Sequence, residues 1–185
     1  NEAEEWSKIK NYKLRLLLSK DKDAGKITEI SCDDANKELK LPKFYLYNLA
    51  HMQRFYLENI KIEKDSFRLR ELSEDERAFY NKIHFDCEIN SETLGGFKEV
   101  AGCHYRADHD LKGHQDGSKE KIKVFDENKR ILPHVIELSF GVYRSIWALL
   151  DLFFREEKER TLFTFPGIVS PFDIAVFPLV NKDNL

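Results

Sequence analysis

Two glutamates occur in strand-like apolar surroundings, which is an unusual place for a carboxylate. Glu99 is followed by Val100 and Ala101, and Glu137 ends the run Pro-His-Val-Ile-Glu at 133–137. Burying an ionised carboxylate is costly unless it is paired. Two such groups would suit a small pocket for a cation such as an ammonium group. The alternative is that both point to solvent from edge strands, and the pattern alone favours that alternative.

The segment from Glu137 to Arg144 contains a second group of residues that could bind a ligand. A strand ends, Ser139 and Gly141 make a close turn, and Arg144 lies one turn into a helix. Glycine permits close approach of the backbone to a ligand. An arginine at this point can lay its guanidinium on a nucleobase or bind a phosphate with two hydrogen bonds. An arginine on an exposed helix face fits the spacing equally well.

The chain gives little support for metal or nucleophilic chemistry. Its closely spaced histidines recur every five residues, at His104, His109 and His114. That spacing suits neither face of a helix, and no cysteine pair accompanies it, so we expect no zinc. We expect instead a turn held by a pair between Arg106 and either Asp108 or Asp110. Ser139 has no histidine-plus-acid partner that the sequence identifies, so a hydrolase triad is a poor fit.

Several elements must position these residues. Aromatic and aliphatic residues at helical steps predict a helix over 44–60 that packs in the core. Ser-Glu-Asp-Glu at 73–76 fits a capping box and predicts a helix over 77–83. Alternating runs at 84–89 and 96–102 predict a hairpin.

The second half of the chain continues this pattern. Residues 112–130 are polar and interrupted by glycine, which predicts a surface loop, and a short strand is expected over 131–137. The strongest helix should follow Phe140-Gly141 and end at the charged run 155–160. Its apolar face consists of Val142, Ile146, Leu149, Leu150 and Phe153. After a Pro-Gly break, a fresh strand is expected over 173–180.

The composition of the chain excludes several classes of function. The 185 residues predict one domain, or one domain plus a fragment of another, and 42% hydrophobic with 12% aromatic residues exclude a disordered chain. A net charge of −3 argues against a protein that only grips phosphates through a large basic surface. The absence of a long apolar run and of a basic, apolar start predicts a cytoplasmic protein with no membrane association. Three cysteines without zinc spacing are expected to be reduced thiols.

The motifs together resemble those of glycyl-tRNA synthetases. Gly-Phe-Lys-Glu-Val-Ala-Gly at 96–102, followed by Arg-Ala-Asp-His-Asp-Leu at 106–111, is similar to the family's Gly-Trp-x-Glu-hydrophobic-x-Gly and Arg-Thr-Asp-Tyr-Asp-Leu. Residues 133–144 resemble motif 3, Pro-x-Val-Ile-Glu-Pro-Ser-x-Gly-x-x-Arg. Residues 165–172 resemble the junction into the anticodon-binding domain. The matches keep the family's order over about residues 45–185.

Two shorter matches and three departures complete the resemblance. Phe-Arg-Leu-Arg at 67–70 and Ala-Phe-Tyr at 78–80 resemble the segment before the hairpin in archaeal and eukaryotic members. Leu138 replaces the usual proline, Ala107 replaces threonine, and Phe97 keeps an aromatic ring in place of tryptophan. We expect the first two departures to be tolerated.

The resemblance implies an α+β fold: an antiparallel class II synthetase sheet flanked by helices, then the first strand of an α/β anticodon-binding domain. Residues 1–165 would be the C-terminal part of the catalytic domain, and 166–185 the junction and the start of the next domain. The implied activity is a glycine–tRNA ligase, which activates glycine with ATP and Mg²⁺ to glycyl-adenylate and transfers it to tRNA(Gly). The complete protein would be a homodimer.

The resemblance also assigns residues. The glycine site would comprise Glu137, Leu138, Ser139, Phe140 and Gly141, with Glu137 taking the ammonium group. The ATP site would comprise Glu99, Val100, Gly141, Val142, Tyr143 and Arg144, with Arg144 stacking on adenine. Arg106 and Asp110 would support the pocket.

The family's motif 1, at the dimer interface, and motif 2, whose arginine grips the α-phosphate, have no counterpart here. With Asn1 at its start, the chain is expected to be a portion of a longer synthetase that is inactive alone. A non-catalytic synthetase-like accessory protein that binds nucleic acid or a polymerase is the alternative. A third possibility is a structural or regulatory fragment that pairs with a full synthetase.

Overall fold

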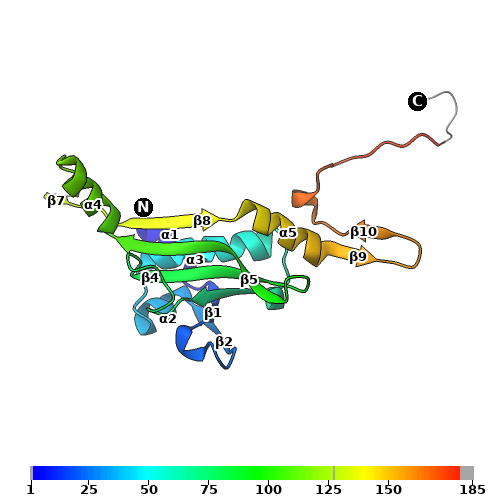
Figure 1. Ribbon diagram of the computed structural model, residues 1–185, viewed down its shortest axis with the longest axis horizontal. Coiled ribbons are helices and arrows are strands. Elements are labelled where there is room, and N and C mark those ends of the chain that lie inside the picture. The colour runs from blue at the N-terminus through cyan, green and yellow to red at the C-terminus, as the bar shows by residue number, and fades with distance from the viewer. Residues whose placement is uncertain (1, 127, 180–185) are drawn as a thin grey trace.

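The computed structural model describes residues 2–126 and 128–179, and the fold is α+β (Figure 1). A six-stranded sheet has the order β2-β1-β3-β4-β5-β8. Its strands are β1 (Lys13–Leu17), β2 (Ile27–Ser31), β3 (Phe67–Glu71), β4 (Ile83–Ser91), β5 (Gly96–Ala107) and β8 (Val135–Phe140). The helices are α1 (Glu2–Ile9), α2 (Cys32–Glu38), α3 (Lys43–Arg54), α4 (His109–Ser118) and α5 (Val142–Phe153).

The sheet is mixed rather than wholly antiparallel, which corrects the expectation from the sequence. All neighbouring strands run antiparallel except β1 and β3, which are parallel. A parallel pair needs a long connection between its strands. Here β2, α2, α3 and a π-helical turn at Phe55–Asn59 lie between β1 and β3 and provide it.

The core lies between helix α3 and one face of the sheet, with α1 and α2 packed against α3. The Tyr45 hydroxyl donates to the backbone carbonyl of Cys103 at 2.7 Å and so ties α3 to β5. The rings of Tyr56 and Phe67 stack with their centroids 5.6 Å apart. The predicted helix over 44–60 and its core role are therefore confirmed, although Phe44 itself is exposed.

The predicted hairpin is confirmed as β4 and β5, and both strands are longer than the sequence runs indicated. The predicted strong helix is confirmed as α5. Its apolar face, however, is largely exposed at Val142, Ile146 and Leu150, and the buried residue of this helix is Ala148. Amphipathic spacing predicted the helix correctly but did not reveal how little of that face packs within this chain.

The helix predicted over 77–83 is wrong. Glu76 does accept a hydrogen bond from the Ser73 amide at 3.2 Å, as a capping box requires. The carboxylate also binds Lys22 at 2.5 Å and Arg70, and the following residues form turns until Ile83 starts β4. Phe79, an apolar side chain of this segment, is 88% exposed rather than packed in the core, and short helices need such packing.

The predicted surface loop at 112–130 contains regular structure. Helix α4 extends through Ser118, and β6 (Val124–Asp126) pairs with β7 (Lys129–Ile131). The surface position is confirmed, because β6 and β7 are exposed throughout. The next strand begins at Val135 rather than Ile131, because its register is set by pairing with β5.

No strand forms over 173–179, which contradicts the predicted strand over 173–180; Val180 lies outside the described residues. Val176 is 90% exposed. A strand requires hydrogen-bond partners on a neighbouring strand, and none of the described residues supplies them to this segment. The small hairpin of β9 (Phe154–Glu156) and β10 (Thr161–Phe163) precedes it. The division of the chain at residues 165 and 166 stays a prediction.

The three cysteines are free, as the sequence predicted, and all three are buried. Burial raises the pKa of Cys32 and of Cys103 to about 12, and it also raises the pKa of Cys87. Only the thiolate is nucleophilic. We therefore expect the folded chain at pH 8 to react with a thiol reagent at least ~100-fold more slowly than the unfolded chain.

A chromogenic disulfide reagent, with and without concentrated urea, measures this difference. At pH 8 all three thiols should react much faster after unfolding, and the reaction of the folded chain should accelerate as the pH rises. One thiol that reacts fast in the native chain would contradict the burial of that cysteine.

Among residues 2–126 and 128–179, no helix combines the length and the apolar character needed to cross a membrane.

Candidate active site

The sheet face opposite α3 carries a cluster of polar side chains on its last three strands. His104 on β5 is paired with His84 on β4 and with Glu137 on β8. Gly102 on β5 is paired in the same way with Asp86 and Ser139. Because side chains alternate between the two faces of a strand, these residues share one face. The cluster comprises His84, Asp86, Gly102, His104, Glu137 and Ser139.

Glu137 is held by Arg106 from the neighbouring strand. The second guanidinium nitrogen of Arg106 binds Asp110 at 2.7 Å, which confirms one of the two predicted pairs. The Arg106 guanidinium also lies over the ring of Tyr80, 4.4 Å from its centroid. Glu137 remains 39% exposed, so it is oriented by a fixed cation while one side still faces solvent.

Ser139 has a partner that sequence reasoning missed. Its Oγ lies 3.1 Å from Nε2 of His104 and 3.5 Å from the carbonyl oxygen of Gly102. A Cβ at Gly102 would stand 2.6 Å from Nε2 of His104, so a side chain there would displace the imidazole. The available signal was strand alternation, which would place Gly102 and His104 on one face had the predicted strand over 96–102 been extended by two residues.

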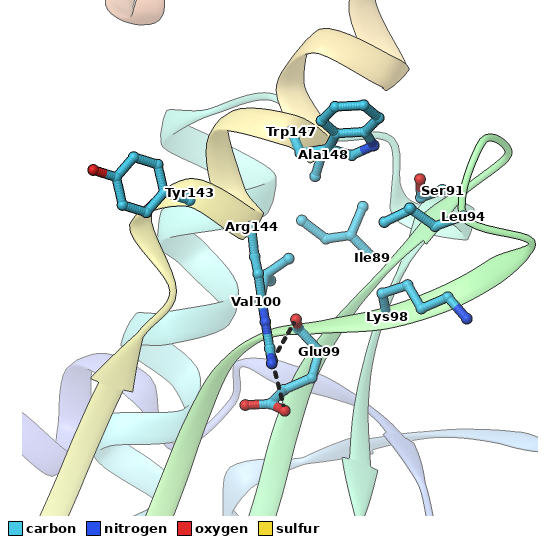
Figure 2. A pocket seen from close by; sticks show the side chains of 10 residues that line it. All are labelled: Ile89, Ser91, Leu94, Lys98, Glu99, Val100, Tyr143, Arg144, Trp147 and Ala148. Carbon is cyan, nitrogen blue, oxygen red and sulfur yellow. Dashed lines mark hydrogen bonds and ion pairs between the residues drawn. The ribbon is translucent and has the colours of Figure 1, made fainter.

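A separate pocket of about 580 Å³ lies between the β4–β5 hairpin and α5 (Figure 2). Within it, Arg144 points toward Glu99, with 2.8 Å between its Nη1 and the carboxylate and 3.3 Å to the backbone oxygen. The pocket is lined by Ile89, Ser91, Leu94, Lys98, Glu99, Val100, Tyr143, Arg144, Trp147 and Ala148.

Both glutamates singled out from the sequence are thus paired with an arginine. Glu99 is an exposed member of its ion pair, as the favoured solvent-facing alternative predicted, and Glu137 is only partly exposed. The two pairs are Glu99 with Arg144 and Glu137 with Arg106. Exposed pairs of the first kind contribute little to stability. Arg144 can therefore exchange Glu99 for a ligand at low cost.

Helix α5 is fixed over this pocket by the turn of the hairpin. Ser91 donates to Asp151 at 2.6 Å, and the indole of Trp147 donates to Thr93 at 3.1 Å. At the other end of the pocket, the Gly141 amide donates to the carbonyl of Val100 at 2.8 Å. A Cβ at Gly141 would lie 3.1 Å from that same oxygen, so glycine lets β8 turn closely against β5.

The structure does not bring every sequence-assigned residue into these two sites. Leu138 and Phe140 alternate to the face opposite Glu137 and Ser139, and Phe140 packs against Phe55 with the ring centroids 6.0 Å apart. Tyr143 points away from the pocket centre (Figure 2). Val142 is exposed and is not among the lining residues, whereas Val100 is buried at the pocket floor. Among the described residues, no three potential ligands are grouped to hold a metal ion.

No family model matches the sequence. Curated aminoacyl-tRNA synthetases do match it. The glycine–tRNA ligase of Mesoplasma florum is 33% identical over 148 residues, which are 76% of this chain and 32% of the relative. That of Borreliella afzelii is 33% identical over 156 residues, 79% of this chain and 34% of the relative. That of Ureaplasma parvum serovar 3 is 35% identical over 141 residues, 72% of this chain and 29% of the relative.

The resemblance to glycyl-tRNA synthetases is therefore confirmed over about three quarters of the chain. The chain spans about a third of the length of these curated relatives. The three organisms are bacteria, so the archaeal or eukaryotic style of residues 67–70 and 78–80 stays a prediction.

Proposed function

We propose that this chain forms the part of a glycine–tRNA ligase that recognises glycine and the nucleoside portion of ATP. The carrying observation is that Glu137 and Ser139 stand side by side on one sheet face, one held by Arg106 and the other by His104. The similarity to glycine–tRNA ligases supports the substrate assignment.

Glycine selection follows from charge and from lack of space. The carboxylate of Glu137 takes the substrate ammonium group, since Arg106 already fixes its orientation. The neighbouring strand carries Gly102, where one added carbon would collide with His104. A wall of backbone and tightly held polar groups leaves room for an amino acid without a side chain and excludes larger ones.

The pocket beside α5 accommodates the nucleotide in this proposal. Arg144 releases Glu99 and stacks on the adenine ring, a cation–π contact. The apolar walls at Val100 and Ala148 suit a planar base. Glu99 then lies near the phosphates of the magnesium–ATP substrate.

The proposed first step forms one bond and breaks one. A carboxylate oxygen of glycine attacks the α-phosphorus, the bond from phosphorus to the bridging oxygen breaks, and pyrophosphate leaves with those electrons. Glycyl-adenylate remains and is then transferred to the 3′ end of tRNA(Gly). The residues of this chain contribute positioning and charge. The proposal includes that the 185 residues alone are inactive and that the complete protein is a cytoplasmic homodimer.

Glycine-dependent ATP–pyrophosphate exchange on the full-length protein tests the function. Exchange with glycine and none with alanine is the expected result. A well-folded full-length protein without exchange would leave the synthetase-like accessory protein as the better account, and nucleic-acid binding would then be the next measurement.

Substituting Arg144→Ala should raise KM for ATP about tenfold and leave KM for glycine nearly unchanged. The reason is that a lost cation–π contact is worth about 1–2 kcal/mol, and each 1.4 kcal/mol is a factor of ten. Steady-state exchange rates at varied ATP and varied glycine separate the two constants. Arg160→Ala, an exposed arginine paired with Glu157, is the matched control. An unchanged KM for ATP in the Arg144 variant would remove this residue from the nucleotide site.

A further inference from the structure

His104 lies between Ser139 and a second polar side chain. Its Nε2 is 3.1 Å from Oγ of Ser139, and its Nδ1 is 3.3 Å from Nδ2 of Asn81. Asn81 and its neighbour His84 are both more than nine-tenths buried. The imidazole is thus fixed at both nitrogens, and His104 itself is partly buried.

These two contacts indicate which nitrogen of the His104 imidazole carries the hydrogen. The nitrogen end of the Asn81 amide faces the ring, and an amide nitrogen only donates, so in this orientation Nδ1 of His104 accepts from it. In a neutral imidazole the other nitrogen then carries the hydrogen. Nε2 therefore donates to the Ser139 hydroxyl oxygen.

The surroundings keep His104 neutral. Burial lowers the pKa of His104, and the nearby His84, with its ring centroid 4.0 Å away, lowers this pKa further. Opposing this, Glu137 on β8, Asp86 on β4 and Glu99 on β5 raise the pKa of His104, and the net direction is downward.

We propose that His104 is a positioning residue that makes Ser139 a hydrogen-bond donor to the carboxylate of the bound substrate. Because the Ser139 oxygen accepts from Nε2, its own hydrogen must point elsewhere. Among the residues that the structure describes, the acceptor is the Gly102 carbonyl at 3.5 Å, which is long for such a bond. A carboxylate oxygen of glycine is a stronger acceptor. The identity of the ligand as glycine rests on the proposed function. The tautomer of His104 does not depend on that function.

Because Nε2 of His104 carries the hydrogen in this tautomer, His104 and Ser139 cannot act as the base and nucleophile of a catalytic triad. A general base for Ser139 would need an unprotonated Nε2. With Nε2 protonated, His104 cannot take the serine proton. His104 therefore orients Ser139 for binding, and the serine does not attack the substrate.

Nitrogen NMR of the full-length protein labelled at its histidines tests the tautomer without any activity. The His104 signals, assigned by their loss in His104→Gln, should show hydrogen on Nε2. Hydrogen on Nδ1 would overturn the proposal, since Ser139 would then donate to the imidazole. The NMR measurement tests the tautomer even if the protein shows no glycine-dependent exchange. The absence of exchange would refute the proposed function and not the tautomer.

Exchange kinetics test the consequence. His104→Leu should lower kcat/KM for glycine about tenfold with KM for ATP unchanged, because one partly buried hydrogen bond is lost. His104→Gln should stay within about threefold of the parent, because its amide nitrogen can replace Nε2 as the donor. In a Ser139→Ala background, His104→Leu should have no further effect. Additive losses, or equal losses in the Gln and Leu variants at matched thermal midpoints, would overturn the proposal.

Discussion

Substituting Glu137→Gln should lower kcat/KM for glycine about a hundredfold in the exchange reaction. The amide keeps the shape of the carboxylate but loses the charge that meets the substrate ammonium group. A hydrogen bond to a charged group contributes about 1.5–3 kcal/mol, and each 1.4 kcal/mol is a factor of ten. The loss should be expressed mainly as a higher KM for glycine.

The fold should survive this change, because Arg106 keeps its 2.7 Å contact with Asp110. The thermal midpoint of the variant is the check on that point. Glu120→Gln, at an exposed position in the segment between α4 and β6, is the matched control and should leave the kinetics unchanged. A Glu137→Gln variant that binds glycine as well as the parent would place the ammonium group elsewhere.

Substituting Phe67→Ala should lower the free energy of unfolding by about 3–5 kcal/mol. Phe67 is fully buried at the start of β3, stacks on Tyr56 and pairs with Ile89 on β4. Removing the ring loses its burial and leaves a cavity between the sheet and the chain that follows α3. Domains are stable by only about 5–15 kcal/mol, so this is a large share of the total.

Urea denaturation followed by circular dichroism gives the free energy of unfolding for each variant. Phe177→Ala removes the same ring from a residue that is 84% exposed. The control should change stability by no more than ~0.5 kcal/mol. Equal losses at the two positions would contradict the assignment of the core to the face of the sheet that α3 covers.

The two faces of the sheet have different roles, one in stability and the other in the proposed chemistry. One face carries the buried rings and thiols that pack against α3, and the other carries the paired carboxylates and histidines. Strand alternation alone produces this division, because successive residues of β5 and β8 point to opposite faces. Cys103 thus lies on the core side and His104 on the polar side of the same strand. Changes to one face can therefore be tested separately from changes to the other.

The elements whose signals are local could be predicted from the amino-acid sequence. Alternation predicted β4 and β5, helical spacing predicted α3 and α5, and the motif residues pointed to Glu99, Glu137 and Arg144. Arg106 and Asp110 are four residues apart, and their predicted pair formed. Each of these depends on residues close together in the chain, so periodicity and short spacing carry the information.

Features that depend on residues far apart in the chain could be found only in the folded protein. The capping pattern at 73–76 produced no helix, because Glu76 binds Lys22 and Arg70 and the following Phe79 is exposed rather than packed in the core. The strand over 173–179 did not form, because a strand exists only beside another strand. The contact between His104 and Ser139 spans 35 positions of sequence and follows from the register of β5 against β8. Register is a property of the assembled sheet, and no local pattern in either strand states it.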